Sequence, residues 1–284
     1  ACDEMLRRLQ TLDESRQEFV SNVSHELKTP LTSMKVLADS LMGQEDIPVE
    51  LYREFMTDIG AEIDRENKVF EIMFVNGPFE RLHMLMGFEN ALCALLTDPE
   101  EVEEFFNTYM EWKIKLMEKV IEYYKPDVLM FHDDWGTQNN MFFSPDVWRS
   151  LIKPQIKKAV DRCHELGVLF DMHSCGKIEA VVPEFVELGI DAWQGMEIND
   201  IPKLKSITGM NLGYHTTPDY QGYQTEALAG TLTEEDLRRR VREVFEKTAE
   251  GYCYCPMFLP FGGWSTEVMI DEIMKCGKTI YKDA

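Results

Sequence analysis

The sequence predicts a protein of the α/β class, in which a helical hairpin precedes a sheet of parallel strands. Up to about residue 68, apolar residues recur at helical spacing from Leu6 and Leu9 onward, with one break at the stretch GQEDIP. From about residue 69, short apolar runs alternate with amphipathic segments. Strands that alternate with helices along the chain indicate parallel strands joined by crossover helices.

The hairpin comprises residues 1–68. Its first helix carries Phe19, Val23 and Leu27 on one face, and its second begins at Leu51. Because two helices cannot bury such an apolar seam alone, we expect the hairpin to pair with a second copy and make the chain a homodimer.

The second part, residues 69–284, contains six candidate strands, which are FEIMFVN, DVLMFH, GVLFDMH, DAWQG, MNLGYH and YCYCPMF. A closed (β/α)8 barrel of the TIM-barrel type has eight strands. The count therefore predicts a TIM-barrel-type domain that is truncated at its N-terminal end.

Composition limits the possible partners and compartment. The net charge of -22 argues against nucleic acid and anionic membranes, because phosphate groups are bound by clustered cations. The chain has seven cysteines, and neither a signal peptide nor an apolar run of roughly 18 residues is recognisable. We expect a cytoplasmic protein without a membrane span in this chain.

Within the first part, the stretch SNVSHELKTPLTSM resembles the dimerisation and phosphoacceptor domain of histidine kinases. The resemblance implies that His25 is a phosphoacceptor, with Glu26 beside it as proton acceptor. After position 70, however, the sequence shows no asparagine box, DxGxG, GxGxxG or P-loop pattern for binding ATP. We expect no complete kinase in this chain.

The second part is similar to the uroporphyrinogen decarboxylase superfamily in four motifs, FHDDWGTQNNMFFSPDVWRSLIKP, DMHSCG, GPFERL and GYCYCP. The superfamily includes porphyrinogen decarboxylases, zinc-dependent corrinoid methyltransferases and part of the cobalamin-independent methionine synthases. Two partial units in one chain can come from a natural gene fusion, an engineered chimera or an artefact of sequence assembly, and the sequence does not decide among these origins.

A pair of metal donors ends one candidate strand. His173 and Cys175 are one residue apart and face the same side of an extended chain, so they can bind one ion together. The resemblance to the methyltransferase branch implies two more ligands, Glu197 and either Cys255 or Cys253 in the last strand. Zn²⁺ is the expected cofactor, with Glu197 yielding its position to substrate.

Other polar residues also lie at expected strand ends. Asp133, Asp134 and Glu197 are candidate catalytic carboxylates, and Trp135 is a candidate apolar wall for substrate. His215 is a candidate second polar contact. His83, His132 and His164 have no recognisable partner pattern in the sequence.

These features together predict zinc-dependent methyl transfer that involves a corrinoid on a partner protein, or a small thiol or ether as methyl donor or acceptor. The alternative within the superfamily is a uroporphyrinogen decarboxylase-type lyase, which needs no metal. A further alternative is a two-component signalling fragment or an inactive fusion scaffold.

Overall fold

The computed structural model describes residues 69–196, 198–216, 220–249 and 263–280. The predicted hairpin over residues 1–68, with His25 and Glu26, lies outside these ranges.

The described residues form one sheet of five parallel strands in the order β1-β2-β3-β4-β5. Each strand lies beside its neighbour in sequence, as in a (β/α) barrel. Five of the six predicted strands are confirmed, and the sixth, YCYCPMF, lies outside the described ranges. The strands are β1 (Glu71–Phe74), β2 (Val128–His132), β3 (Leu169–His173), β4 (Ala192–Gly195) and β5 (Gly213–Thr216).

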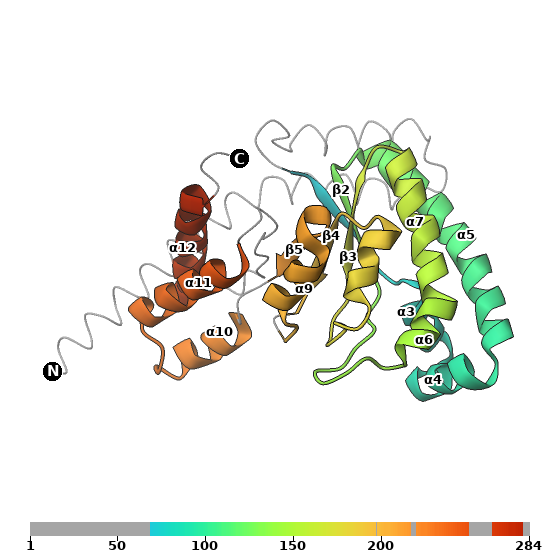
Figure 1. Ribbon diagram of the computed structural model, residues 1–284, viewed down its shortest axis with the longest axis horizontal. Coiled ribbons are helices and arrows are strands. Elements are labelled where there is room, and N and C mark those ends of the chain that lie inside the picture. Colours follow the sequence, from blue (N-terminus) through green and yellow to red (C-terminus); the bar gives the residue numbers. More distant parts are fainter. Residues whose placement is uncertain (1–68, 197, 217–219, 250–262, 281–284) are drawn as a thin grey trace, which may run out of the picture. The chain divides into compact units, whose positions relative to one another are not determined.

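Helices connect the strands and continue after β5 (Figure 1). Helices α5 and α7 pack against each other beside the sheet. The helices are α3 (Pro78–Met86), α4 (Phe88–Thr97), α5 (Pro99–Tyr124), α6 (Pro145–Val147), the π-helical turn η1 (Trp148–Ile152), α7 (Lys153–Glu165), the 3₁₀ turn η2 (Val182–Glu184), α8 (Phe185–Leu188), α9 (Ile201–Thr208), the 3₁₀ turn η3 (Gly209–Asn211), α10 (Tyr220–Leu228), α11 (Glu234–Thr248) and α12 (Trp264–Ile280).

The long helix α5 shows how the sequence sets these elements. Pro99 occupies its first turn, where the missing N–H costs no hydrogen bond, and Lys125 ends it in a left-handed conformation. Its buried residues recur every three or four positions, which places them on one stripe. The stripe consists of Val102, Phe106, Met110, Lys113, Met117 and Ile121.

The core lies between the sheet and these helices. Leu129 and Phe131 in β2 and Phe170 and Met172 in β3 are fully buried. Central strands of a parallel sheet are covered on both faces, so they read as nearly continuous apolar runs. At the carboxyl ends of these two runs stand His132 and His173, where the candidate site lies.

A separate apolar cluster joins α10, α11 and α12. Thr233 caps α11, since its hydroxyl oxygen accepts the N–H of Asp236 at 3.1 Å. Arg238 on α11 pairs with Asp271 and Glu272 on α12 at 2.6 and 2.8 Å. Among the described helices, none has the length and apolar character needed to cross a lipid bilayer.

Candidate functional site

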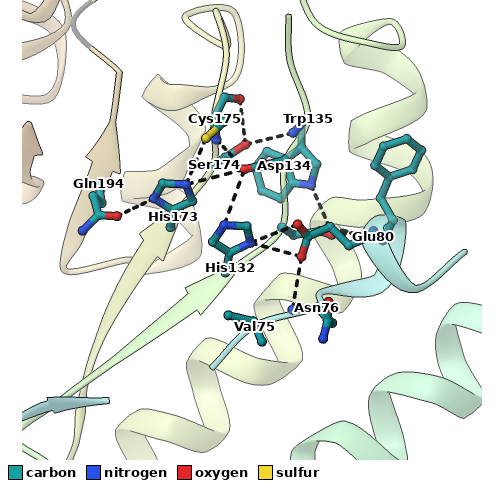
Figure 2. A network of polar contacts seen from close by, with 12 residues as sticks. Val75, Asn76, Glu80, His132, Asp134, Trp135, His173, Ser174, Cys175 and Gln194 are labelled. Atoms are coloured by element: carbon teal, nitrogen blue, oxygen red, sulfur yellow. Dashed lines mark hydrogen bonds and ion pairs between the residues drawn. The ribbon is translucent and has the colours of Figure 1, made fainter. Parts of the chain in front are cut away.

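Polar side chains meet at the carboxyl ends of β2, β3 and β4. His132 pairs with His173 in the register of β2 and β3, and His173 pairs with Gln194 in that of β3 and β4. In a parallel sheet these ends lie at one edge, which is where barrel enzymes gather their catalytic groups. Figure 2 shows the resulting network of polar contacts.

His173 is held in a defined orientation within this network. Its Nδ1 contacts Oε1 of Gln194, and its Nε2 lies 3.2 Å from Sγ of Cys175. An amide oxygen can only accept, so Nδ1 carries the proton and Nε2 presents a lone pair. Burial, followed by the charge of neighbouring His132, lowers the pKa of His173 below its usual value. The neutral imidazole that results is the form that binds metals.

His132 is oriented from the other side by Glu80 of α3. Its Nδ1 lies 3.0 and 3.1 Å from the two carboxylate oxygens of Glu80, which also accepts the N–H of Asn76. Burial lowers the pKa of His132, but Glu80 and the nearby aspartates outweigh it, so the pKa lies above its usual value. The ring stacks on that of His173, with centroids 4.3 Å apart and planes 10° apart.

Asp134 faces both imidazoles. Its Oδ1 lies 3.5 Å from Nε2 of His173 and 3.9 Å from Nε2 of His132. The same oxygen accepts the backbone N–H of Cys175 at 2.6 Å, which fixes the carboxylate against the β3 end. The donor atoms of these two histidines and of Asp134 all lie within 4.8 Å of one another.

Asp133, the residue before Asp134, caps the N-terminus of α3 and does not face the imidazoles. Its fully buried carboxylate accepts the N–H groups of Phe79 and Glu80 at 3.3 and 2.8 Å and the indole N–H of Trp135 at 2.7 Å. Gly77 at the N-cap of α3 has no side chain, so Asp133, the residue that follows β2, supplies the cap. Burial raises the pKa of Asp133 to about 7, against these donors, which favour its charged form. This contact fixes the start of α3 and thereby Glu80.

The structure brings together only some of the predicted site residues. His173, Cys175 and Asp134 are neighbours. Trp135 is fully buried and packs against Trp148 and Phe185, with ring centroids 5.6 and 6.2 Å away. Its role as a substrate wall stays a prediction, as does the catalytic role of Asp133.

The remaining predicted residues cannot be placed as site members. The backbone of His215 pairs with that of Gln194 in the register of β4 and β5. That register puts it in the same row of the sheet as His173, and its contact with substrate stays a prediction. Glu197, Cys253 and Cys255 lie outside the described residues.

Sequence reasoning missed Glu80, His132 and Gln194. His132 could have been found, since it ends its strand as His173 does and precedes two aspartates. The sequence gives no comparable signal for Glu80, because its position depends on how α3 is anchored to β2. Gln194 lies within the run DAWQG, and only the strand register places it beside His173.

The donors present fit a zinc ion. Zinc binds imidazole nitrogen, thiolate sulfur and carboxylate oxygen at roughly 2.0–2.3 Å, so a tetrahedral site separates such donors by roughly 3.3–3.6 Å. The separations of 3.2 Å from His173 to Cys175 and 3.5 Å from His173 to Asp134 are close to those values. The mixture of nitrogen, sulfur and oxygen donors is also one that zinc accepts.

Comparison with protein families finds a match over residues 15–255 to the family described as uroporphyrinogen decarboxylase (URO-D). Among solved structures, a methyltransferase from Methanosarcina mazei is similar, with a TM-score of 0.60 and 14% sequence identity. The similarity covers 80% of this chain and 64% of that one. At this identity the likeness concerns the fold alone, and it agrees with the predicted TIM-barrel type.

The N-terminal region is also partly similar to sensor kinases. The chain is 44% identical over 54 residues to the sensor-like histidine kinase SenX3 of Mycolicibacterium smegmatis, which is 19% of this chain and 14% of that protein. It is 38% identical over 72 residues to the heme sensor protein HssS of Staphylococcus saprophyticus, or 25% of this chain and 16% of that protein. The match to the decarboxylase family begins at residue 15, within the predicted hairpin, so the domain boundary near residue 68 stays a prediction.

Proposed function

Because the chain belongs to the uroporphyrinogen decarboxylase family, which it matches over residues 15–255, we propose that it is a zinc-dependent methyltransferase of that family. The substrates are a small thiol or ether and a corrinoid carried by a partner protein. In the thiol direction, a thiolate attacks the methyl carbon of a methyl–cobalt(III) corrinoid, forming a thioether and cobalt(I), and the thiol proton leaves to solvent.

One observation carries the proposal, the pairing of His173 Nε2 with Cys175 Sγ at 3.2 Å at the end of β3. Gln194 holds the other ring nitrogen, a pattern that fixes a metal-binding histidine in the tautomer that can ligate. The side chain of Cys175 is half-buried and so partly accessible to solvent, whereas His173 is buried.

When bound at these residues, zinc would act as a Lewis acid that lowers the pKa of a substrate thiol, so that the thiolate exists at neutral pH. The chain's own residues prepare this site. Asp134 accepts the N–H of Cys175 and so orients the cysteine. Glu80 and Gln194 hold the two stacked imidazoles, which limits the rearrangement needed during the reaction.

A decarboxylase-type lyase is the second candidate, because the matching family bears that activity in its description. It differs from the first candidate in its dependence on the metal, since porphyrinogen decarboxylation needs none. Metal content and the metal dependence of activity therefore separate the two.

The first experiment measures zinc per chain in the intact protein, prepared without chelator, and in His173→Ala. The matched control is His164→Ala. His164 lies on α7 and pairs at 2.7 Å with Asp191, the residue before β4, so it is away from the strand ends of the site. We expect about one zinc per chain in the intact protein and the control, and almost none in His173→Ala. Circular dichroism establishes that each variant is folded.

The second experiment mixes the zinc-loaded protein with methylcobalamin and a panel of small thiols and follows the loss of the cobalt–carbon absorbance. Methyl transfer should disappear in His173→Ala and persist in His164→Ala. An intact folded protein that takes up no zinc, or equal zinc in all three proteins, would falsify the methyltransferase proposal.

A further inference from the structure

We infer that Tyr109 and Lys113 of α5 are positioning residues, which act through the backbone of the loop between β1 and α3 to hold Glu80 and thereby fix the ring of His132. The geometry of the described residues carries the positioning. The inference rests on the proposed function for one consequence only, which is the effect of a fixed His132 ring on methyl transfer.

The backbone of Asn76 connects α5 with Glu80. Its C=O accepts a hydrogen bond from the Tyr109 hydroxyl at 2.6 Å, and its N–H donates to Oε2 of Glu80 at 3.1 Å. That oxygen lies 3.1 Å from Nδ1 of His132, and the other carboxylate oxygen lies 3.0 Å from the same nitrogen. Figure 2 shows the contacts from Asn76 through Glu80 to His132. A single residue of the loop thus joins the Tyr109 hydroxyl to the carboxylate that orients the imidazole.

Asn76 has an unusual backbone conformation. Its φ of 65° lies in the left-handed region, which residues other than glycine seldom adopt, although asparagine does so more readily than most. A conformation of this kind persists only where the surrounding contacts hold it. The hydrogen bonds to Tyr109 and Glu80 hold Asn76 at its C=O and at its N–H, so they maintain the conformation that directs this N–H at the Glu80 carboxylate.

Lys113 holds the preceding residue of the same loop. Its side chain is buried, and its ammonium group donates to the C=O of Val75 and lies 4.0 Å from the centre of the Phe74 ring. A buried cation is costly without such partners, so the side chain has little freedom to leave the loop. Tyr109 and Lys113 are four residues apart on α5 and therefore lie on one face of it. Two consecutive C=O groups of the loop are bound from that face.

The same contacts could serve the stability of the fold alone, and the two roles differ in what they predict for His132. Its ring stacks on that of His173, with centroids 4.3 Å apart and planes 10° apart. A positioning role requires that loosening of the loop changes the contact between Glu80 and His132. A role in stability alone requires only a lower melting temperature.

The test uses the metal-free protein labelled with ¹⁵N-histidine, so that its result does not depend on zinc. Nuclear magnetic resonance detects the proton on Nδ1 of His132, because a ring N–H that donates to the buried Glu80 carboxylate is protected from exchange with water. The signal is assigned by its absence from His132→Phe. The rate at which this proton exchanges with water measures how firmly Glu80 holds the ring.

The first key variant is Tyr109→Phe, which keeps the ring and removes the hydroxyl. The matched control is Tyr214→Phe, because the buried Tyr214 hydroxyl is hydrogen-bonded to Thr208 at 2.9 Å, away from the loop. Both variants should melt at a somewhat lower temperature. We expect about 5-fold faster exchange of the His132 proton in Tyr109→Phe, the factor that corresponds to the net contribution of one hydrogen bond. Tyr214→Phe should leave the exchange rate unchanged, and Tyr109→Phe with Lys113→Met should increase it further.

Two variants of Asn76 test the loop without altering α5. Asn76→Gly keeps both backbone groups and adopts the left-handed conformation readily, so the slow exchange of the His132 proton should be retained. Asn76→Val introduces a β-branched residue that disfavours this conformation, so exchange should accelerate as in Tyr109→Phe. This pair decides the question even if the double variant of α5 does not fold.

Activity provides a separate readout in the zinc-loaded protein. With saturating substrates, kcat for methyl transfer should fall roughly 10-fold in Asn76→Val and stay unchanged in Asn76→Gly, since groups that orient the side chains of a metal site have effects of that size. If His132 exchanges at the same rate in the intact protein, Tyr109→Phe and Asn76→Val, the residues support the fold alone and the inference fails. If exchange responds as expected in a chain that transfers no methyl group, the positioning stands and the proposed function fails.

Discussion

Removal of the Asp133 carboxylate tests how the site is anchored. In Asp133→Ala, three N–H donors lose their acceptor, namely those of Phe79, Glu80 and the Trp135 indole. A buried donor without a partner costs about 1–3 kcal/mol, so three cost about 3–9 kcal/mol. We expect about 3–6 kcal/mol, because a water molecule can enter the vacated space and satisfy part of the demand.

Such a loss is large beside the roughly 5–15 kcal/mol by which a folded protein is stable. Thermal unfolding followed by circular dichroism should show a decrease in Tm on the order of 10 °C. The matched control is Asp127→Ala, since the exposed side chain of Asp127 accepts the N–H of Phe70 at 2.8 Å, at the start of the sheet and away from the site. The control should lose no more than about 1 kcal/mol.

The reasoning is refuted if Asp133→Ala melts at the temperature of the intact protein, or if Asp127→Ala loses as much stability. A second readout follows from the role of Asp133 in fixing Glu80. The ring of His132 should become more mobile in Asp133→Ala, which nuclear magnetic resonance of ¹⁵N-labelled histidines can detect. An unchanged His132 signal in a destabilised variant would mean that Asp133 supports the fold without orienting Glu80.

Other perturbations test the core, the start of α3 and the N-terminal part of the chain. Burial, with repulsion from Arg81, lowers the pKa of Lys113 to about 8. Between that value and the ordinary lysine pKa of 10.5 the unfolded chain binds more protons at this position, so stability from this group rises with pH across that window. The Lys113→Met variant should lack this rise. If the melting temperatures of the variant and of the intact protein change equally with pH between about 7.5 and about 9.5, the expectation is contradicted. Gly77→Ala should destabilise by about 1–3 kcal/mol in urea unfolding, because overpacking has that cost. The added Cβ would lie 2.3 Å from Cβ of Asp133, and a neutral result would show that α3 can shift. The purified chain should not become labelled at His25 from radioactive ATP, since nothing in its sequence positions the γ-phosphate; acid-labile phosphate formed without added kinase would overturn this. Sedimentation of the whole chain should show a dimer, and a monomer at high concentration would exclude pairing through the predicted hairpin.

Local spacing along the chain was enough to predict the class of fold and the edge of the sheet that carries polar chemistry. Apolar runs alternating with helical segments identify five strands that the structure contains, and two of them, β2 and β3, end in His132 and His173. The pairing of His173 with Cys175 was also readable, because residues two apart on an extended chain face the same side. Each of these features depends on the order of neighbouring residues, which a sequence records directly.

Which of these residues meet depends on the packing of whole elements. Strand register places His132 beside His173 and His173 beside Gln194, and register is set by the burial of entire strand faces. Asp133 and Asp134 are adjacent in sequence, yet one caps α3 and the other faces the imidazoles. Glu80 joins the site because α3 starts on the buried carboxylate of Asp133. Contacts between residues some fifty positions apart leave no periodic signal in a single sequence, because they arise from the three-dimensional packing of separate elements.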